Sequence, residues 1–483
     1  MPIAFLGGVH PPTNKKFTEN FYISELTPAS RVYIPVVQHI GKPAIVCVKV
    51  GDYVKIGTLI AKADGDVSAN IFSSVSGKVA AIETKTTAHG DVQHIVIDND
   101  FSDQTEFLPR LENPTPEQIL QRIADCGIVG MGGAGFPTAV KLNVPKGDKI
   151  DTLIINGAEC EPYITADHRI MLEYPNQILK GALYIAKALN VDNIIIGVED
   201  NKKDAVEILN KVISQNNYSN IKVVAVKTKY PQGAEKQLIY ALTKRVVPAT
   251  SLPSKVGVIV NNVHTALAVY YAVWEGQPLY RRVVTVSGGA VKNKGNYWIR
   301  IGTTYDEILK DCKAANSLEN VKIKQDLIRE KQALIGSLDK SESKRAKQLN
   351  SEIKNLQKEL EEMKSAQCYM IVNGGPMMGE AAKSAGEVVT ATTSAVLFLT
   401  KDEVNNIEPS QCINCGKCAR VCPMRLMPMY IDLACIAGDW ADAKKYGAVD
   451  CILCGCCSYI CPAKRDLVSS MKKSKKMIAK RGI

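Results

Sequence analysis

Ten of the fifteen cysteines lie between Cys412 and Cys461, and eight of these ten repeat one spacing twice. The spacing is Cys-x2-Cys-x2-Cys-x3-Cys-Pro. Three thiolates at this spacing surround one face of an iron–sulfur cluster, and the fourth, which precedes proline, ligates the other cluster. We therefore predict two [4Fe–4S] clusters. The first set of ligands is Cys412, Cys415, Cys418 and Cys461, and the second set is Cys422, Cys451, Cys454 and Cys457.

Structural zinc is the alternative for these cysteines. Zinc sites usually show two pairs of ligands separated by 12–20 residues, whereas this chain has two triples, each followed by Cys-Pro. Cys435 and Cys456 fall outside the repeated spacing. We expect these two residues to be packing residues.

A second candidate site is the glycine-rich stretch from Gly127 to Thr138. Four glycines within Gly130–Gly135 would let the backbone approach a ligand closely, and the amino terminus of a following helix would favour phosphate. The Gly-Lys-Ser/Thr of a Walker A motif does not follow. On its own, such a stretch is as consistent with a tight turn as with a ligand site.

The elements that must position these residues change in character along the chain. Residues 1–110 contain short β-branched runs separated by turn residues, which predicts a β domain. Residues 115–275 alternate continuous apolar runs at 152–155, 193–198 and 256–260 with helix-length segments such as 176–189 and 203–215. This alternation predicts a Rossmann-like parallel sheet covered on both faces.

Residues 278–400 mix strand-like runs with a helical insert at 318–365. The apolar residues of the insert recur every three or four positions on both sides of a polar break at 336–343, which predicts an antiparallel coiled-coil hairpin. The hairpin could be a docking arm or a tolerated surface insertion. Residues 402–466 form the expected cluster domain, so the fold class is multidomain α/β and α+β.

Composition and charge narrow the function classes. The chain has 483 residues, enough for three or four domains. Its first residues do not have the layout of a signal peptide, and no apolar run is long enough to span a bilayer, so we expect a cytosolic protein.

The formal net charge is +11, and six of the cations lie in residues 470–483. This basic tail is either a disordered end or a segment that contacts anionic lipid or an acidic partner. With aromatic residues at only 6%, nucleic-acid binding is not expected.

Several stretches together resemble a known family. Gly130–Thr138, Asn156–Pro162 and Asn261–Thr265 are similar, in the same order, to the flavin-site motifs of the NADH-binding 51 kDa subunit of respiratory complex I. The closer resemblance is to the RnfC family, the electron-input subunits of membrane-bound Rnf complexes. It rests on the stretches Phe5–Pro12, Gln38–Gly41, Gly157–Tyr163, Lys229–Leu238 and Gly374–Gly379.

The resemblance implies sites that the spacing alone does not define. The residues implied for FMN are Gly130, Gly132, Gly133, Ala134, Gly135, Lys141, Asn156, Glu159, Tyr230, Gly233, Asn261, Asn262 and Thr265. Those implied for NADH are Phe136, Glu161 and Glu235. Ala158 and Ala234 replace acidic residues of complex I. We expect no catalytic residue beyond the cofactors, because hydride transfer to flavin needs no protein nucleophile. His10, His39 and His264 are therefore interpreted as structural.

The resemblance also implies the domain types and the biological setting. Residues 1–110 resemble a barrel-sandwich hybrid domain, in which the Met-Lys-Met of biotin carriers is absent, and residues 278–400 resemble a soluble-ligand-binding β-grasp domain. The implied function is that of a peripheral subunit on the cytoplasmic face of the bacterial membrane. It would belong to a ferredoxin:NAD⁺ oxidoreductase that translocates Na⁺ or H⁺, with integral membrane and peripheral subunits as partners and ferredoxin as an indirect one. The alternatives are a soluble NADH dehydrogenase or hydrogenase-linked flavin subunit, and an electron-transfer scaffold without FMN.

Overall fold

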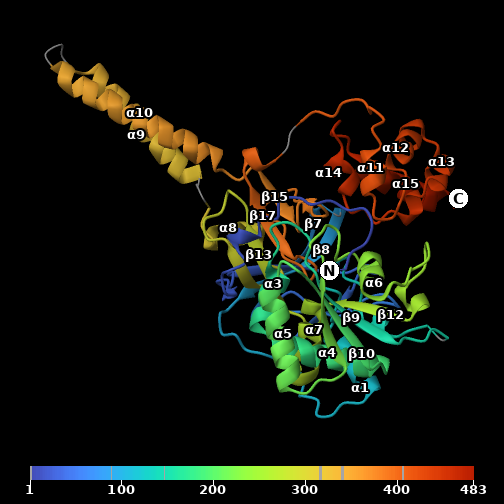
Figure 1. The fold of residues 1–483 in the computed structure, drawn as a ribbon. Helices are drawn as coiled ribbons and strands as arrows, with labels where there is room; N and C mark the ends of the chain where they lie inside the picture. Colours follow the sequence, from blue (N-terminus) through green and yellow to red (C-terminus); the bar gives the residue numbers. More distant parts are fainter. Residues whose placement is uncertain are drawn as a thin grey trace.

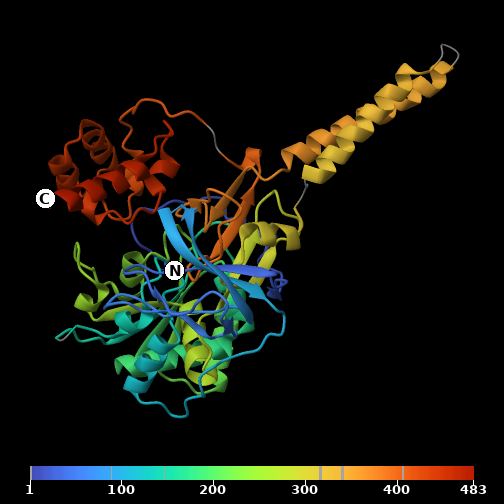
Figure 2. The ribbon, with the colours of Figure 1, turned by 180° about the vertical axis from the view of Figure 1, so that it is seen from behind.

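The computed structural model describes residues 3–88, 90–145, 147–314, 318–338, 342–404 and 407–482. Figure 1 shows a body built from β-sheets and helices, a helical unit at the carboxyl-terminal end, and a helical hairpin that projects away from both. The view from behind in Figure 2 shows the same separation of the three parts. Among the described residues, no helix is both long enough and apolar enough to cross a membrane.

The central sheet of residues 115–275 is entirely parallel, as predicted. Its order is β11 (Ile221–Val226), β10 (Asn193–Glu199), β9 (Thr152–Gly157) and β12 (Val258–Asn262). The sequence analysis did not identify β11. This edge strand buries only Ile221 and Val226, with exposed or half-buried residues between them, so it lacks the continuous apolar run of the inner strands.

Helices cover both faces of this sheet because alternate strand residues point to opposite sides. Leu153 and Ile155 pack in the core formed with five helices, whereas Ile154 packs with α6 (Glu235–Thr243). The five helices are α1 (Pro116–Asp125), α3 (Ala166–Glu173), α4 (Pro175–Leu189), α5 (Lys203–Gln215) and α7 (Val263–Glu275). The short helix α2 (Thr138–Leu142) follows the glycine-rich stretch.

Residues 1–110 form two small antiparallel sheets around one core that includes Val32, Ile34, Ile60 and Ile95. The first sheet holds β2 (Arg31–Pro35), β8 (Gly90–Asn99), β7 (Gly77–Thr87) and β4 (Tyr53–Val54), and the second holds β3 (Ile45–Val46), β5 (Leu59–Lys62) and β6 (Ile71–Phe72). The strand β1 (Ser24–Glu25) is an exception to the expected division, because it pairs with β14 (Gly295–Arg300) of another sheet.

That other sheet has six strands in the order β1, β14 (Gly295–Arg300), β13 (Arg281–Ser287), β17 (Ala395–Leu399), β15 (Met370–Asn373) and β16 (Glu380–Ala381). Helix α8 (Tyr305–Asp311) follows β14. The insert then forms two helices, α9 (Leu318–Gly336) and α10 (Ser343–Ser365), which contact each other and extend from the body (Figure 1).

The carboxyl-terminal unit is an internal duplication with an offset of 39 residues, the step from Cys412 to Cys451. Residues with positive φ recur at this offset, such as Asn414 with Leu453 and Arg425 with Lys464. The helices recur as well. Helix α11 (Lys417–Val421) corresponds to α14 (Cys456–Ile460), and α12 (Pro428–Ala437) corresponds to α15 (Leu467–Arg481), with α13 (Trp440–Lys445) between the two halves.

The basic tail is therefore not a disordered end, and that interpretation is wrong. Residues 470–482 belong to α15 and to the glycine that follows it, and α15 packs against α12 and α13. Met471, Ser474 and Ile478 form the buried face of α15, at a spacing of three and four residues. The expected boundary between the cluster domain and the tail falls in the first turn of this helix.

Candidate functional site

The predicted flavin residues gather at the carboxyl end of the parallel sheet. Strands β9 and β12 are neighbours there, and Asn156 lies opposite Asn262. The chain passes from β9 to β10 and β11 on one side and to β12 on the other, so the strand order reverses between these two asparagines. In open parallel sheets, ligands bind at such a switch point.

The glycine-rich loop lies against this switch point. The Met131 amide donates to Thr265 Oγ1 (3.0 Å), and a Cβ on Gly132 would lie 2.8 Å from the Asn262 side chain, so the loop approaches β12 too closely for any side chain there. Gly132, Gly133 and Ala134 are nevertheless exposed, and a Cβ on Gly133 would meet nothing within 4 Å. The loop thus leaves an open backbone surface at the sheet edge, which fits a flat or phosphate-bearing group.

The asparagines differ in their partners. Asn156 Nδ2 donates to the Gly233 carbonyl (2.8 Å), and Asn262 Nδ2 donates to Asp167 Oδ2 (2.6 Å). Asn261 is buried, and its Nδ2 has no hydrogen-bond partner among the described residues. A buried amide without a partner is uncommon in folded proteins, and it is a donor that a ligand could use.

The Glu159 side chain is buried rather than exposed to a ligand. Its Oε1 accepts from the Asp167 amide (2.6 Å), and its Oε2 lies 3.9 Å from Lys15 Nζ. Lys15 also donates to the carbonyls of Glu159, Glu161 and Ile164. Burial raises the pKa of Glu159 and lowers that of Lys15. The network fixes the 159–164 segment through the contacts of Lys15.

Tyr230 and Glu161 connect this region to the second set of cysteines. The Tyr230 hydroxyl donates to the Cys454 carbonyl (2.7 Å) and lies 3.4 Å from Glu161 Oε1. Glu161 Oε2 accepts from the Met377 amide (3.2 Å), and burial raises the pKa of Glu161 to about 7. Gly233, three residues after Tyr230, donates its amide to Cys160 Sγ (3.4 Å).

The amino-terminal segment joins the same two regions. Val9 and Tyr230 exchange two backbone hydrogen bonds of 2.9 and 3.0 Å, and the Gly8 amide donates to the Val421 carbonyl (2.7 Å). The segment therefore contacts the flavin domain and the cysteine unit at once.

The four predicted ligands of the second cluster line one cavity. This cavity of about 360 Å³, which includes space open to solvent, is lined by Cys422, Cys451, Cys454 and Cys457 together with Cys456 and apolar residues such as Leu426. No three His, Cys, Asp or Glu side chains in the described ranges come together as ligands of a single metal ion. A cavity lined by four thiols fits a cluster of several metal ions. This cavity therefore supports the prediction of the second cluster.

The first cysteine set is more open. Cys415 is exposed, Cys412 and Cys461 are half-buried, and only Cys418 is buried. Of the two cysteines outside the spacing, Cys435 packs in the core between α12 and α15, and Cys456 Sγ lies 3.9 Å from the Tyr230 carbonyl.

No hydrogen bond or ion pair of the described residues joins the three residues implied for NADH to one another, and each has different surroundings. Glu235 pairs with Lys141 (2.7 Å), so Lys141, which the resemblance implies for FMN, already has a carboxylate partner. Glu161 belongs to the contact with Tyr230. Phe136 is 38% exposed beside the glycine-rich loop.

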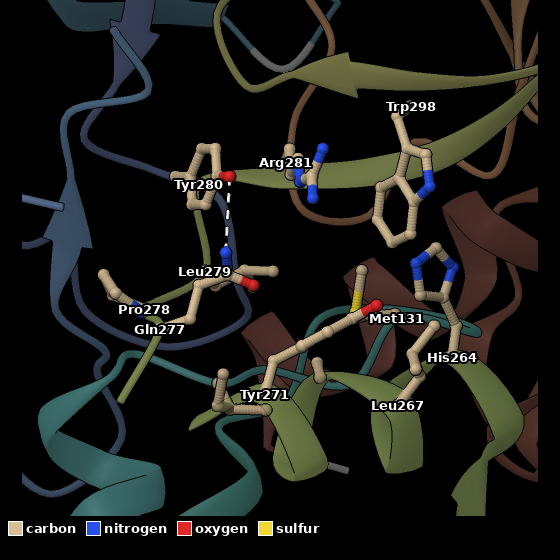
Figure 3. Close-up of a pocket in the computed structure, with 12 residues that line it drawn as sticks. Met131, His264, Leu267, Tyr271, Gln277, Pro278, Leu279, Tyr280, Arg281 and Trp298 are labelled. Carbon is tan, nitrogen blue, oxygen red and sulfur yellow. Dashed lines mark hydrogen bonds between the residues drawn. The ribbon is translucent and has the colours of Figure 1, made fainter. Parts of the chain in front are cut away.

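A further cavity lies on the buried side of the same loop (Figure 3). It is lined by Met131, His264 and Trp298, and by Tyr271 and Tyr280. His264 Nε2 accepts from the Val283 amide (3.3 Å), and burial holds the pKa of His264 well below its usual value, so the ring is neutral. This arrangement agrees with a structural histidine.

Sequence analysis missed Lys15, Asp167 and Cys160. Lys15 and Asp167 belong to no motif, and no pattern in the sequence around them indicates that they are buried. Cys160 lies inside the Asn156–Pro162 stretch, but it is outside the repeated cysteine spacing, which carries no signal for it.

The fold and the site define a flavin and iron–sulfur protein. Residues 3–102 match the RnfC barrel sandwich hybrid domain, residues 123–271 match the Nuo51 FMN-binding domain, and residues 406–425 match the 4Fe-4S binding domain. The chain belongs to the RnfC family.

Three relatives of known name are similar over nearly the whole chain, and each is a component of a larger complex. The first belongs to the proton-translocating ferredoxin:NAD(+) oxidoreductase complex of Clostridium ljungdahlii and is 42% identical over 96% of this chain and 92% of its own length. The second belongs to the Na(+)-translocating ferredoxin:NAD(+) oxidoreductase complex of Acetobacterium woodii and is 39% identical over 98% and 97%. The third belongs to the ion-translocating oxidoreductase complex of Rhodobacter capsulatus and is 37% identical over 98% and 83%.

Among solved structures, a chain of an NAD⁺-reducing [NiFe]-hydrogenase in the H₂-reduced state matches 75% of this chain and 61% of its own. The TM-score is 0.47 and the identity 17%, which is too distant to decide between functions.

Proposed function

We propose that this chain is the NADH-oxidising or NAD⁺-reducing subunit of an ion-translocating ferredoxin:NAD⁺ oxidoreductase. The observation that carries this proposal is the direct contact between the two candidate cofactor regions, through the Tyr230 hydroxyl and the Cys454 carbonyl. Bound FMN would supply the conversion between a two-electron hydride and single electrons, which the clusters would carry onward.

The chain's own residues supply the positions. We propose that the exposed backbone of Gly132–Ala134 and the side chains at the ends of β9 and β12 hold the flavin. One donor would be Asn261 Nδ2, which has no hydrogen-bond partner among the described residues. Phe136, Glu161 and Glu235 remain the proposed nicotinamide-nucleotide residues. The pair Lys141–Glu235 would have to open for Lys141 to reach a phosphate.

We also propose the finer assignments of fold and setting. These are a barrel-sandwich hybrid domain at 1–110, a flavin domain at 115–275, a soluble-ligand-binding β-grasp domain at 278–400 with a coiled-coil hairpin at 318–365, and a cluster domain from 402 that includes α15. The hairpin of β13 and β14, the helix α8 and the central parallel pair β13–β17 support the β-grasp assignment. The proposed partners are integral membrane and peripheral subunits, and the proposed location is the cytoplasmic face of the membrane.

The test is anaerobic purification from membranes, with assays of flavin, iron, acid-labile sulfide and co-purifying subunits. We expect one FMN, about eight iron and about eight sulfide per chain, flavin bleaching on addition of NADH, and integral membrane subunits in the same fraction. A chain that carries FMN and clusters but elutes without membrane subunits would support a soluble dehydrogenase. Clusters without FMN would support the electron-transfer scaffold.

A matched pair of variants tests the flavin position. Gly133→Val places a side chain where the protein leaves open space, so it should fold normally and lose FMN. Gly386→Val introduces the same side chain on an exposed loop, where a Cβ would only reach the Ser384 hydroxyl at 3.5 Å, and should retain FMN. Flavin retained by Gly133→Val would contradict the proposed pocket.

A further inference from the structure

The two halves of the cysteine unit are alike in backbone, but their long helices differ in sequence, and one of these differences lies beside a cluster loop. The 39-residue offset places Lys475 of α15 where α12 has Ile436. Ile436 is 66% exposed on the surface. Lys475 is half-buried, and its Nζ donates to the carbonyl of Cys451, a ligand of the second predicted cluster, at 2.6 Å.

The charges around the two cluster sites therefore differ. Near the second site, Lys475 contacts the loop that begins at Cys451, and Asp450 precedes that cysteine directly. Asp450 Oδ1 is buried without a hydrogen-bond partner among the described residues. Near the first site, Arg465 lies close to Cys412 and Cys461, but Asp432 neutralises it at 2.7 Å. The exposed Arg420 reaches the Cys415 carbonyl at only 3.4 Å. Because water screens exposed charges more strongly, Lys475 acts on its cluster loop more effectively than Arg420 acts on the first.

A cluster gains one negative charge when it is reduced. A fixed cation next to its ligand loop stabilises the reduced form, and the charge and hydrogen bonding around a cluster are among the features that set its potential. The contact also holds the Cys451 carbonyl, which faces the ammonium group instead of solvent.

We propose that Lys475 is a positioning residue that raises the reduction potential of the second cluster relative to the first. The inference rests on the proposed function, because it requires a cluster in each cysteine set. Helix α15, which contains the basic tail of the sequence analysis, would then influence electron transfer through Lys475. The cluster that contacts Tyr230 would then be the better acceptor for electrons that leave the flavin.

The test is a redox titration of both clusters, followed by electron paramagnetic resonance, in the anaerobic full-length protein. Cys415→Ala, which removes the first cluster, assigns the signals. In Lys475→Met we expect the midpoint of the second cluster to fall by at least the equivalent of a tenfold change in its one-electron equilibrium, which is about 59 mV, with the first cluster unchanged. Lys475→Gln, which keeps a donor but no charge, should behave like Lys475→Met, and Lys475→Arg should stay near the native value.

Two controls complete the design. Lys476→Met removes the neighbouring cation of the same helix, which has no contact with the cysteine loops among the described residues, and should leave both midpoints unchanged. Asp450→Asn should shift the second midpoint in the opposite direction to Lys475→Met.

Three outcomes would overturn the proposal. One is an unchanged second midpoint in Lys475→Met, and another is an equal shift in Lys476→Met. The third is loss of the second cluster from both uncharged variants with retention in Lys475→Arg, because Lys475 would then hold the loop without setting the potential. If the native protein does not show two titrating clusters, the proposed function itself is wrong. This outcome is distinguishable from failure of the Lys475 proposal, because it is seen without any variant.

Discussion

The two cysteine sets have the same backbone and opposite surroundings. The second set lies against the flavin domain, with Cys454 and Cys457 buried and the Tyr230 hydroxyl on the Cys454 carbonyl. The first set has Cys415 exposed, beside Ile413, which is 66% exposed. The two halves share one fold, so the difference between the two sets comes from their neighbours. We call the second set the inner site and the first set the outer site.

This difference gives the two sites an order. If the flavin and the clusters are bound as proposed, electrons that leave the flavin region would meet the second set first, because the amino-terminal segment and the Tyr230 turn both contact its loops. The first set is the one from which a partner could collect them. Variants that affect one site and spare the other can test this assignment of inner and outer sites.

Removing one ligand from each set should have the largest and most unequal effect. Cys454→Ala should prevent NADH from reducing either cluster, because the inner site is lost. Cys415→Ala should leave the inner cluster reducible by NADH and abolish only the outer signal. Iron analysis and electron paramagnetic resonance after addition of NADH distinguish the two variants. Equal reduction of the remaining cluster in both would show that the order is wrong.

Loosening the contact between the regions should give the next largest effect. A Cβ on Gly7 would lie 2.8 Å from the Cys422 carbonyl, and φ at Gly7 is +83°. Gly7→Val should slow reduction of the inner cluster while flavin reduction by NADH continues, as stopped-flow absorbance would show. Gly51→Val is the control, since φ is +99° there but a Cβ would meet nothing within 4 Å. Similar slowing in both variants would mean that backbone strain, not docking, is responsible.

The pH dependence of stability should depend on the protonation of Glu161, which is buried between the flavin region and the second cysteine set. Its folded-state pKa of about 7 lies above the ordinary 4.5, so the folded protein keeps a proton that the unfolded chain releases. Stability therefore falls as pH rises from about 4.5 to about 7. Glu161→Gln should remove at most about 3 kcal/mol of this fall, at about 1.4 kcal/mol per pKa unit. Unfolding midpoints across this range test it, and parallel curves for both proteins would contradict it.

The hairpin should have the smallest effect on either site. Helices α9 and α10 project from the body and carry no predicted cofactor residue (Figure 1). Replacing 318–365 with a short Gly/Ser bridge should leave flavin content and NADH oxidation by an artificial acceptor unchanged. If FMN is lost, the insert belongs to the catalytic fold. If only membrane association is lost, the docking-arm alternative gains support.

Sequence was a good guide where spacing reflects a local physical requirement. The cysteine triples, the apolar runs of β9, β10 and β12, and the two helices of the insert all follow from local patterns. Sequence was a poor guide to α15, because six cations concealed the buried positions Met471, Ser474 and Ile478. The signal that could have found this helix is the 39-residue offset from α12.

The contacts of Lys15, Tyr230 and Lys475 could not be predicted for a different reason. Each joins residues more than 20 positions apart, and a single lysine or tyrosine carries no mark of its distant partner. The inner and outer character of the cysteine sets depends on such contacts, so it was not visible in two motifs of identical spacing.

The amino-terminal segment also constrains the timing of biosynthesis. Its partners are made long after it, so Val9 stays unpaired until Tyr230 is synthesised, and Gly8 stays unpaired until Val421 is synthesised. At about 5–20 residues per second, the wait for Val421 is roughly 20–80 s. The contact between the two cofactor regions is therefore among the last to form, and clusters and flavin could be loaded into separate nascent domains before the segment closes over them.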